Sequence, residues 1–355
     1  MITRFGKRYI TSQLAGLVDF SRQDLAFGID NTTPNINGND TRLGFEFYRA
    51  NCLFGTTNIV TDNIGNTTYG IIYTATIPSN ISGIIKEIAL YPKLGAEGQS
   101  IDSKFLSNFE DVTSWQDSGG FIPISSTSPT SRIGDTMMRV SAPQGTSYEY
   151  YNDIESFNLL NYSGLDSISL AYNQTDSNLS KIKVKFYSSE TDYHYVEFNC
   201  STQTSGEYIS TAYLSDMQTY GTTTSTIIRL GIEITAKTGG TSATVYFDGL
   251  RINDEDSFRS DYGMIARSLI TYSTTISGTS GANTITAGSV NNLYIGQKVT
   301  GTGIGSNAVI TAITNNVATL SVNNTGTVSG VGTFYGLKKI AGRPVDIEYR
   351  LGLGF

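Results

Sequence analysis

Few residues of this chain have the types and spacing that catalysis requires. His194 is the only histidine and no Gly-x-Ser-x-Gly elbow accompanies it, so a Ser-His-Asp triad would rest on one residue. A glycosidase needs two carboxylates across a cleft, and the spacing of the acids Asp153, Glu155 and Asp216 singles out no pair. The glycine-rich stretch 301–305 is not followed by the lysine that a phosphate loop needs. We therefore expect a protein that is not an enzyme.

Aromatic side chains offer another chemistry, which is stacking on sugar rings. A glycan-binding surface needs exposed aromatic faces, with amides and carboxylates nearby. The candidates for such a surface are Trp115, Tyr148, Tyr150, Tyr151, Tyr193 and Tyr195. The alternative is that these rings pack against neighbouring strands or subunits.

The composition favours an all-β protein with several domains. The chain has 355 residues, and its charged residues make up 15%, below the usual ~25%. Glycine is abundant at 37 residues, and 22 tyrosines and 16 phenylalanines argue against a disordered polar tract. Many short strands joined by glycine-containing turns would give this composition.

Charge and hydropathy exclude several partners and compartments. The net charge of −7 argues against a nucleic-acid partner, which calls for a basic patch. No apolar run approaches the ~20 residues of a membrane span, and the first residues lack the apolar run of a secretory signal. We therefore expect synthesis in the cytoplasm. Cys52 and Cys200 are expected to be small buried hydrophobic residues rather than a disulfide.

The middle of the chain alternates as the strands of an antiparallel sandwich do. Apolar residues at every second position give each predicted strand one apolar face. These sets are Ile168, Leu170 and Tyr172; Ile182, Val184 and Phe186; His194, Val196 and Phe198; and Ile228, Leu230, Ile232 and Ile234. Lys181, Lys183 and Lys185 fall on the polar face of the second set. We expect residues 99–256 to form a two-sheet jelly roll.

The remaining segments predict two further domains. Residues 2–16 are the one helix candidate, ending at Gly16, and strands follow to residue 98. Residues 275–335 have little charge and short Val/Ile/Leu segments between glycines, which predicts a small β-barrel or roll. Residues 346–355 alternate as a strand that needs a host sheet. We therefore expect a discontinuous β-rich assembly domain made of residues 1–98, 257–274 and 336–355, with the other two domains inserted.

Three groups of segments resemble known families. Residues 5–16, 25–29, 41–49 and 86–91 resemble N-terminal regions of phage tail-fibre and baseplate-associated proteins, and residues 338–351 resemble the ends of such fibre proteins. Residues 105–252 resemble jelly-roll carbohydrate-binding modules, through Phe109-Glu110, Trp115 and the segments 134–140 and 247–252. Residues 295–321 resemble a small β module of phage and bacterial surface proteins.

The resemblance implies a structural ion in the jelly roll. In such modules a glutamate near the first strand and an aspartate in the last strand often share a Ca²⁺ with backbone carbonyls. The matching residues are Glu110 and Asp248, and Ca²⁺ prefers oxygen ligands of this kind. The alternative is that both are ordinary polar residues at strand ends.

The combined resemblance implies a structural protein of a phage virion. It would belong to a tail, baseplate or fibre, form a homotrimer, contact other virion proteins, and display a sandwich that binds host surface polysaccharide. One alternative is a capsid decoration or head-fibre protein. Another is a polysaccharide-degrading tail enzyme, which the modular layout argues against.

Overall fold

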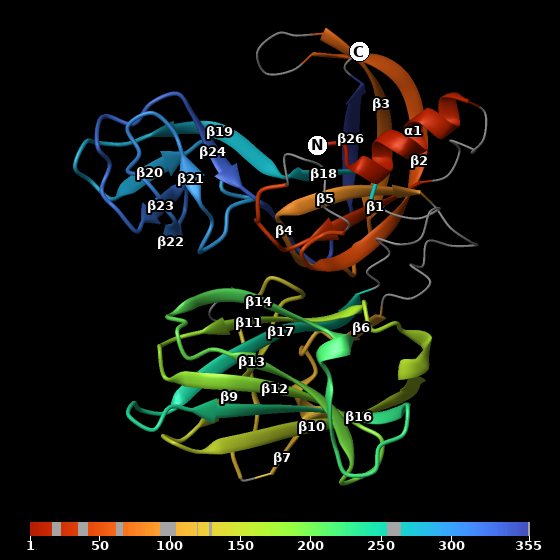
Figure 1. The fold of residues 1–355 in the computed structure, drawn as a ribbon. Helices are drawn as coiled ribbons and strands as arrows, with labels where there is room; N and C mark the ends of the chain where they lie inside the picture. Colours follow the sequence, from red (N-terminus) through yellow and green to blue (C-terminus); the bar gives the residue numbers. More distant parts are fainter. Residues whose placement is uncertain are drawn as a thin grey trace. The chain divides into compact units, whose positions relative to one another are not determined.

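The computed structural model describes residues 1–15, 23–34, 42–61, 67–92, 104–118, 120–127, 130–253 and 264–353 (Figure 1). The described chain is built mostly of antiparallel strands, which confirms the all-β prediction, and its one α-helix is α1 (Arg4–Leu14). The chain divides into two compact units, Met1–Gln99 with Ser257–Phe355 and Ser100–Asp256. The predicted end of the helix at Gly16 and the boundaries near residues 99 and 256 lie outside the described residues. No helix in the described ranges is long and apolar enough to cross a membrane.

The unit Ser100–Asp256 is a sandwich of two antiparallel sheets. The front sheet has the order β15-β13-β12-β16-β10-β7, and the back sheet has the order β14-β11-β17-β9-β8 with β6 beside β17. The strands are β6 (Lys104–Ser107), β7 (Gln116–Asp117), β8 (Ile124–Ser126), β9 (Met137–Ala142), β10 (Ser147–Asn158), β11 (Ser167–Gln174), β12 (Leu179–Tyr187), β13 (Tyr193–Asn199), β14 (Gly206–Tyr213), β15 (Gln218–Tyr220), β16 (Thr226–Ala236) and β17 (Ala243–Asn253). Short 3-10 helices occupy Val112–Ser114, Leu159–Asn161 and Leu214–Asp216.

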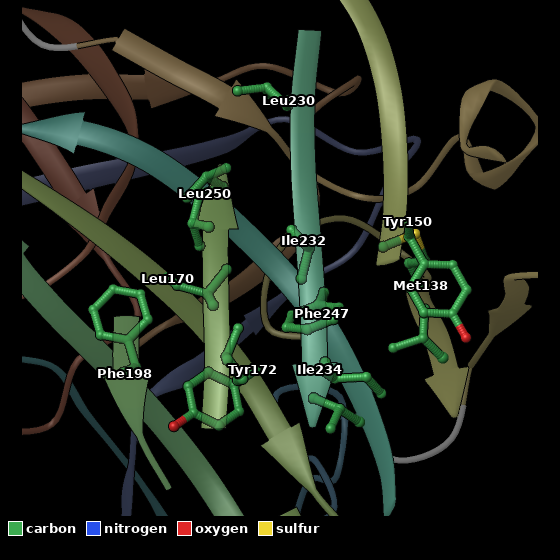
Figure 2. Close-up of a cluster of buried hydrophobic side chains, with 14 of the residues drawn as sticks. Met138, Tyr150, Leu170, Tyr172, Phe198, Leu230, Ile232, Ile234, Phe247 and Leu250 are labelled. Carbon is green, nitrogen blue, oxygen red and sulfur yellow. The ribbon is translucent and has the colours of Figure 1, made fainter. Parts of the chain in front are cut away.

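The two sheets bury one continuous apolar core between them (Figure 2). Ile182, Val184 and Phe186 of β12 point into this core, as the alternation predicts. Ile228 differs, because it is exposed and Ile227 is buried in its place. The β10–β16 ladder has an irregularity beside this residue, which shifts the inward positions by one. A local irregularity therefore fixes which residues of β16 form the outer face.

The first unit has a sheet that joins strands from both ends of the chain. Its order is β18-β5-β1-β2-β3-β26, and β4 pairs separately with β25. The strands are β1 (Gln23–Gly28), β2 (Glu46–Thr61), β3 (Thr67–Ile77), β4 (Gly83–Ile85), β5 (Glu87–Pro92), β18 (Ala266–Leu269), β25 (Leu337–Lys339) and β26 (Val345–Leu353). Helix α1 packs Tyr9 into the core of this sheet. Gly6 allows the close approach, because a Cβ there would lie 2.0 Å from the Ile265 carbonyl oxygen.

A small closed barrel forms part of the same unit. Its strands are β19 (Thr271–Ser277), β20 (Thr284–Ala287), β21 (Val299–Thr300), β22 (Ile310–Thr314), β23 (Val317–Leu320) and β24 (Val331–Tyr335). They are ordered β21-β24-β19-β20-β23-β22, and a bridge between Lys298 and Val309 joins the two ends of this order. Ile276, Val299 and Phe334 are among the side chains that fill the interior. Closure removes the exposed edges that so short a sheet would otherwise present.

Candidate functional site

A cluster of tyrosines lies on the outer face of the front sheet. Tyr187 of β12 lies opposite Tyr193 of β13, which lies opposite Tyr220 of β15. The rings of Tyr193 and Tyr220 are stacked with centroids 5.1 Å apart, and those of Tyr187 and Tyr195 lie 4.9 and 5.8 Å from Tyr193. Tyr220 is 60% exposed. We call Tyr187, Tyr193, Tyr195 and Tyr220 the tyrosine cluster.

Another tyrosine extends the same face across the sheet. Tyr151 of β10 lies opposite Gly231 of β16, and Gly231 lies opposite Lys185 of β12, which in turn lies opposite Tyr195. Tyr151 and Tyr195 are thus three strand spacings apart, about 14 Å. A Cβ on Gly231 would lie 2.8 Å from the Tyr187 ring, so glycine is needed for that ring to lie across β16. The face therefore presents aromatic rings at two separate places along a line that crosses the strands.

Ion pairs lie between and beside these rings. Lys185 Nζ lies 2.7 Å from Glu149 Oε2 and 2.8 Å from Glu233 Oε2. Tyr187 Oη donates a hydrogen bond to the other oxygen of Glu149. The remaining pairs on this face are Lys183–Glu233 at 3.6 Å, Lys181–Glu197 at 3.1 Å and Arg229–Asp153 at 2.5 Å. Each of these basic groups therefore has an acidic partner, and the positive and negative charges of this face balance.

Pairing within this network favours the charged forms of Glu233 and Lys185. Burial opposes the charged form of Glu233, but the hydrogen bond from Lys185 and the charges of the neighbouring lysines outweigh it and lower the pKa of Glu233. Burial likewise opposes the charge on Lys185, but its hydrogen bonds to Glu149 and Glu233 raise the pKa of Lys185. A strongly paired carboxylate with a lowered pKa is a fixed charge rather than a proton donor.

The cations also contact the ring faces. Lys185 Nζ lies 4.7 Å from the ring centroid of Tyr193, and Lys183 Nζ lies 4.8 Å from that of Tyr195. The Arg229 guanidinium carbon lies 4.7 Å from the ring centroid of Tyr151. Such cation–π contacts hold the rings in fixed orientations. The sheet thus presents preoriented aromatic side chains among paired charges.

The structure places three of the predicted aromatic residues on this face and three elsewhere. Tyr151, Tyr193 and Tyr195 are on the face. Trp115 and Tyr150 are 4% and 0% exposed in the core, so neither ring has a free face for a sugar, and the prediction for them is corrected.

Their contacts explain that burial. The Trp115 ring packs 5.2 Å from that of Phe109. Tyr150 Oη donates to the Ser141 carbonyl at 2.8 Å. Tyr148 shares the inward parity of Tyr150 and packs edge-on against Phe121, so it too leaves the candidate face.

Two residues of the tyrosine cluster were not predicted from the sequence. Tyr187 continues the polar face set by Lys181, Lys183 and Lys185, so extending that period by one step would have found it. Tyr220 lies on the three-residue strand β15, which is too short to show alternation.

The predicted calcium residues contact one segment of chain through hydrogen bonds. Asp248 Oδ1 accepts from Ser131 Oγ at 2.9 Å and from the Ile133 N–H at 3.2 Å. Its Oδ2 accepts from the N–H and the Nε of Arg132 at 2.7 and 3.3 Å. Glu110 Oε1 accepts from the Asp135 N–H at 2.6 Å.

This arrangement does not fit a shared calcium ion. Asp248 already accepts four hydrogen bonds, one of them from a cationic guanidinium. Within the described ranges, no group of three or more His, Cys, Asp or Glu side chains is placed to hold a metal. The two carboxylates instead fix the segment 131–135 by accepting its N–H and hydroxyl groups.

No protein-family model and no curated protein matches this chain. Among solved structures, it is similar to a family 11 carbohydrate-binding module from Clostridium thermocellum in complex with a β-1,3-1,4-mixed-linked tetrasaccharide, with 14% identity, a TM-score of 0.34, and coverage of 44% of this chain and 98% of that one. It is also similar to a family 28 module specific for non-crystalline cellulose, with 11% identity, a TM-score of 0.29, and coverage of 41% of this chain and 92% of that one. A family 27 module of Caldicellulosiruptor saccharolyticus in complex with mannohexaose is similar to it with 11% identity, a TM-score of 0.30, and coverage of 43% of this chain and 98% of that one.

Proposed function

We propose that this protein is a non-enzymatic, glycan-binding component of a phage virion, and that the outer face of its front sheet binds the sugar. The observation that carries the binding proposal is the stacked pair of the half-buried Tyr193 and the exposed Tyr220, with Tyr195 beside it and Tyr151 on the same face. Tyrosine supplies a large, rigid contact area at low entropic cost, and its ring face stacks on the apolar face of a sugar.

The paired charges favour an uncharged sugar chain. Because the lysines and Arg229 of this face already have carboxylate partners, an acidic polysaccharide would have to displace an ion pair. Sugar hydroxyls can accept from the ammonium groups and donate to the carboxylates without breaking these pairs. The face thus suits a neutral glycan lying across the strands.

Binding without hydrolysis is favoured by the pairing of the acids with Lys185. A glycosidase needs a protonated carboxylic acid with a raised pKa beside an ionised partner. The pKa of Glu233 is lowered instead, and Lys185 lies between Glu233 and Glu149. The pair therefore supports a structural role for both carboxylates.

The virion part of the proposal is supported by the resemblance of the two ends of the chain to phage tail-fibre and baseplate-associated proteins. In this proposal residues 1–99 and 257–355 assemble as a homotrimer with other virion proteins, and the sandwich faces the host. Capsid decoration remains the alternative position. Immunogold microscopy of particles, with antibodies against residues 104–253, separates the two. Label at the tail supports the proposal, label over the head moves the protein to the capsid, and unlabelled particles contradict both.

The binding proposal is tested by screening the full chain on a glycan array and titrating the best ligand by calorimetry. We expect Tyr193→Ala and Tyr220→Ala each to weaken binding roughly five- to ten-fold through the loss of stacking. Tyr213→Ala is the matched control, because Tyr213 is 51% exposed on β14 of the back sheet. An array without any bound glycan, or equal affinities for all three variants, would contradict the assignment of this face.

A further inference from the structure

The Arg132 guanidinium is buried among oxygen atoms of the sandwich. Its Nη2 donates to the carbonyl oxygens of Tyr172 and Tyr208 at 3.1 and 3.3 Å. Its Nε lies 3.3 Å from Asp248 Oδ2, and its Nη1 lies 3.9 Å from Glu207 Oε2. The Arg132 side chain is 4% exposed and that of Asp248 is fully buried.

Three neighbouring strands of the back sheet supply these oxygens. Tyr172 of β11 and Tyr208 of β14 are direct cross-strand partners. Asp248 lies at a bulge of β17, because Gly249 pairs with Ala171 and Phe247 pairs with Tyr172, which leaves Asp248 unpaired between them. A bulge re-aims a side chain, and it accounts for a carboxylate at this buried position. The backbone ladder therefore sets the positions of these strand-borne oxygens.

Such a set of oxygens calls for a cation. Burial raises the pKa of Asp248, so an ionised carboxylate here needs a positive charge beside it. Two carboxylates with backbone carbonyls are also the ligand types that Ca²⁺ prefers. In this chain the positive charge comes from an arginine in the segment that Asp248 itself holds.

We propose that the Arg132 guanidinium is the built-in cation of this oxygen cluster, so that the sandwich keeps its fold without Ca²⁺, and that removal of the guanidinium leaves a site for a divalent cation. This departs from the calcium ion that the sequence resemblance implies. It stands independently of glycan binding, because Tyr172, Tyr208 and Asp248 lie on strands of the back sheet, whereas the candidate glycan face belongs to the front sheet.

Thermal unfolding of the full chain tests the proposal. The wild-type melting temperature of the sandwich should be the same in EDTA and in CaCl₂. Arg132→Ala should lower it by about 10 °C in EDTA, because a buried carboxylate loses its partner. The variant should then recover progressively as CaCl₂ increases, and less with MgCl₂, whose smaller ion demands stricter geometry. Arg139→Ala is the control, because Arg139 is an exposed arginine of β9. The melting temperature of this variant should not change with either salt.

Two results would overturn the inference. One is a wild-type melting temperature that falls on addition of EDTA, because the fold would then need a metal. The other is an Arg132→Ala melting temperature that does not change with CaCl₂, because its oxygens would then form no cation site. If Arg132→Ala does not accumulate as folded protein in EDTA, the refolding yield becomes the readout. A higher yield in CaCl₂ supports the proposal, and equal yields contradict it.

Discussion

At the scale of single residues, Lys185 controls the charge balance of the candidate glycan face. Its ammonium lies between the carboxylates of Glu149 and Glu233 and is 5% exposed. Lys185→Met would leave those carboxylates without their shared cation, and we expect a loss of about 2–3 kcal/mol of stability at pH 7. Urea unfolding measures this loss.

The pH dependence of that loss has a definite sign. The pKa of Glu233 is lowered in the folded wild type, so its contribution is present above the unfolded pKa and is lost as pH falls through the folded pKa. In Lys185→Met, burial still raises the pKa of Glu233, but the hydrogen bond and charge of Lys185 that lowered it are gone. The protonated form of Glu233 is therefore favoured. The difference between wild type and variant should therefore shrink as pH falls to about 4. Lys181→Met is the control, because its pair with Glu197 is well exposed and should contribute less than about 1 kcal/mol. Equal losses in the two variants would refute the special role of Lys185.

The aromatic residues show what the sequence could predict at this scale. Period-two alternation placed Tyr193 and Tyr195 opposite the apolar positions of β13, and they lie on the outer face. Tyr148, Tyr150 and Tyr151 include consecutive positions, which cannot share one face of a strand, and the sequence did not reveal which parity points outward. The packing of β10 against the core decides it, and only Tyr151 faces outward. Burial of Trp115 depends on contacts with distant strands, which no local pattern encodes.

At the scale of elements, a buried ion pair joins strands from the two halves of the first unit. Arg267 of β18 lies 2.8 Å from Glu87 of β5, and Glu87 also accepts the N–H groups of Gly44 and Phe45. Burial raises the pKa of Glu87 to about 7, although Arg267 opposes this shift. Glu87 therefore links β5 both to β18 and to the segment before β2.

This shift predicts how the first unit responds to pH. The folded pKa of Glu87 is above its unfolded value near 4.5, so the folded state takes up a proton first as pH falls. Stability should therefore decrease as pH rises from about 4.5 to about 7, by at most about 3 kcal/mol. We expect Glu87→Gln to flatten this slope in urea unfolding series between pH 5 and pH 8. Glu348→Gln, in an exposed pair with Arg350, should keep the wild-type slope, and an unchanged slope in Glu87→Gln would refute the assignment.

Element types were easier to predict than their neighbours. The alternation of Ile347, Tyr349 and Leu351 predicted a strand that needs a host sheet. Its register, with Tyr349 opposite Tyr73, depends on long-range pairing that the alternation does not contain. The small barrel is similar, because spaced apolar residues predicted its strands but not the Lys298–Val309 bridge that closes it.

At the scale of the whole molecule, the sandwich is inserted between two adjacent strands of the first unit. Leu90 of β5 lies opposite Ala266 of β18 in an antiparallel pair. The Ile265 N–H donates to the Leu90 carbonyl oxygen at 2.7 Å, directly before that strand. The chain therefore leaves and returns at positions that a short hairpin turn could join.

This connectivity predicts that the two units fold separately. A chain in which a turn of about four residues replaces residues 93–263 should remain soluble and melt cooperatively, because every described strand of the first unit is retained. The isolated segment Ser100–Asp256 should also melt cooperatively, because it contains both sheets and the whole of its core. If the candidate face is the binding site, this segment should bind the array-selected glycan with the affinity of the full chain, and calorimetry compares the two. A folded segment with much weaker binding would mean that the glycan also contacts the first unit. An unfolded segment would mean that the sandwich needs the first unit for its stability, and the insertion would then be no independent domain.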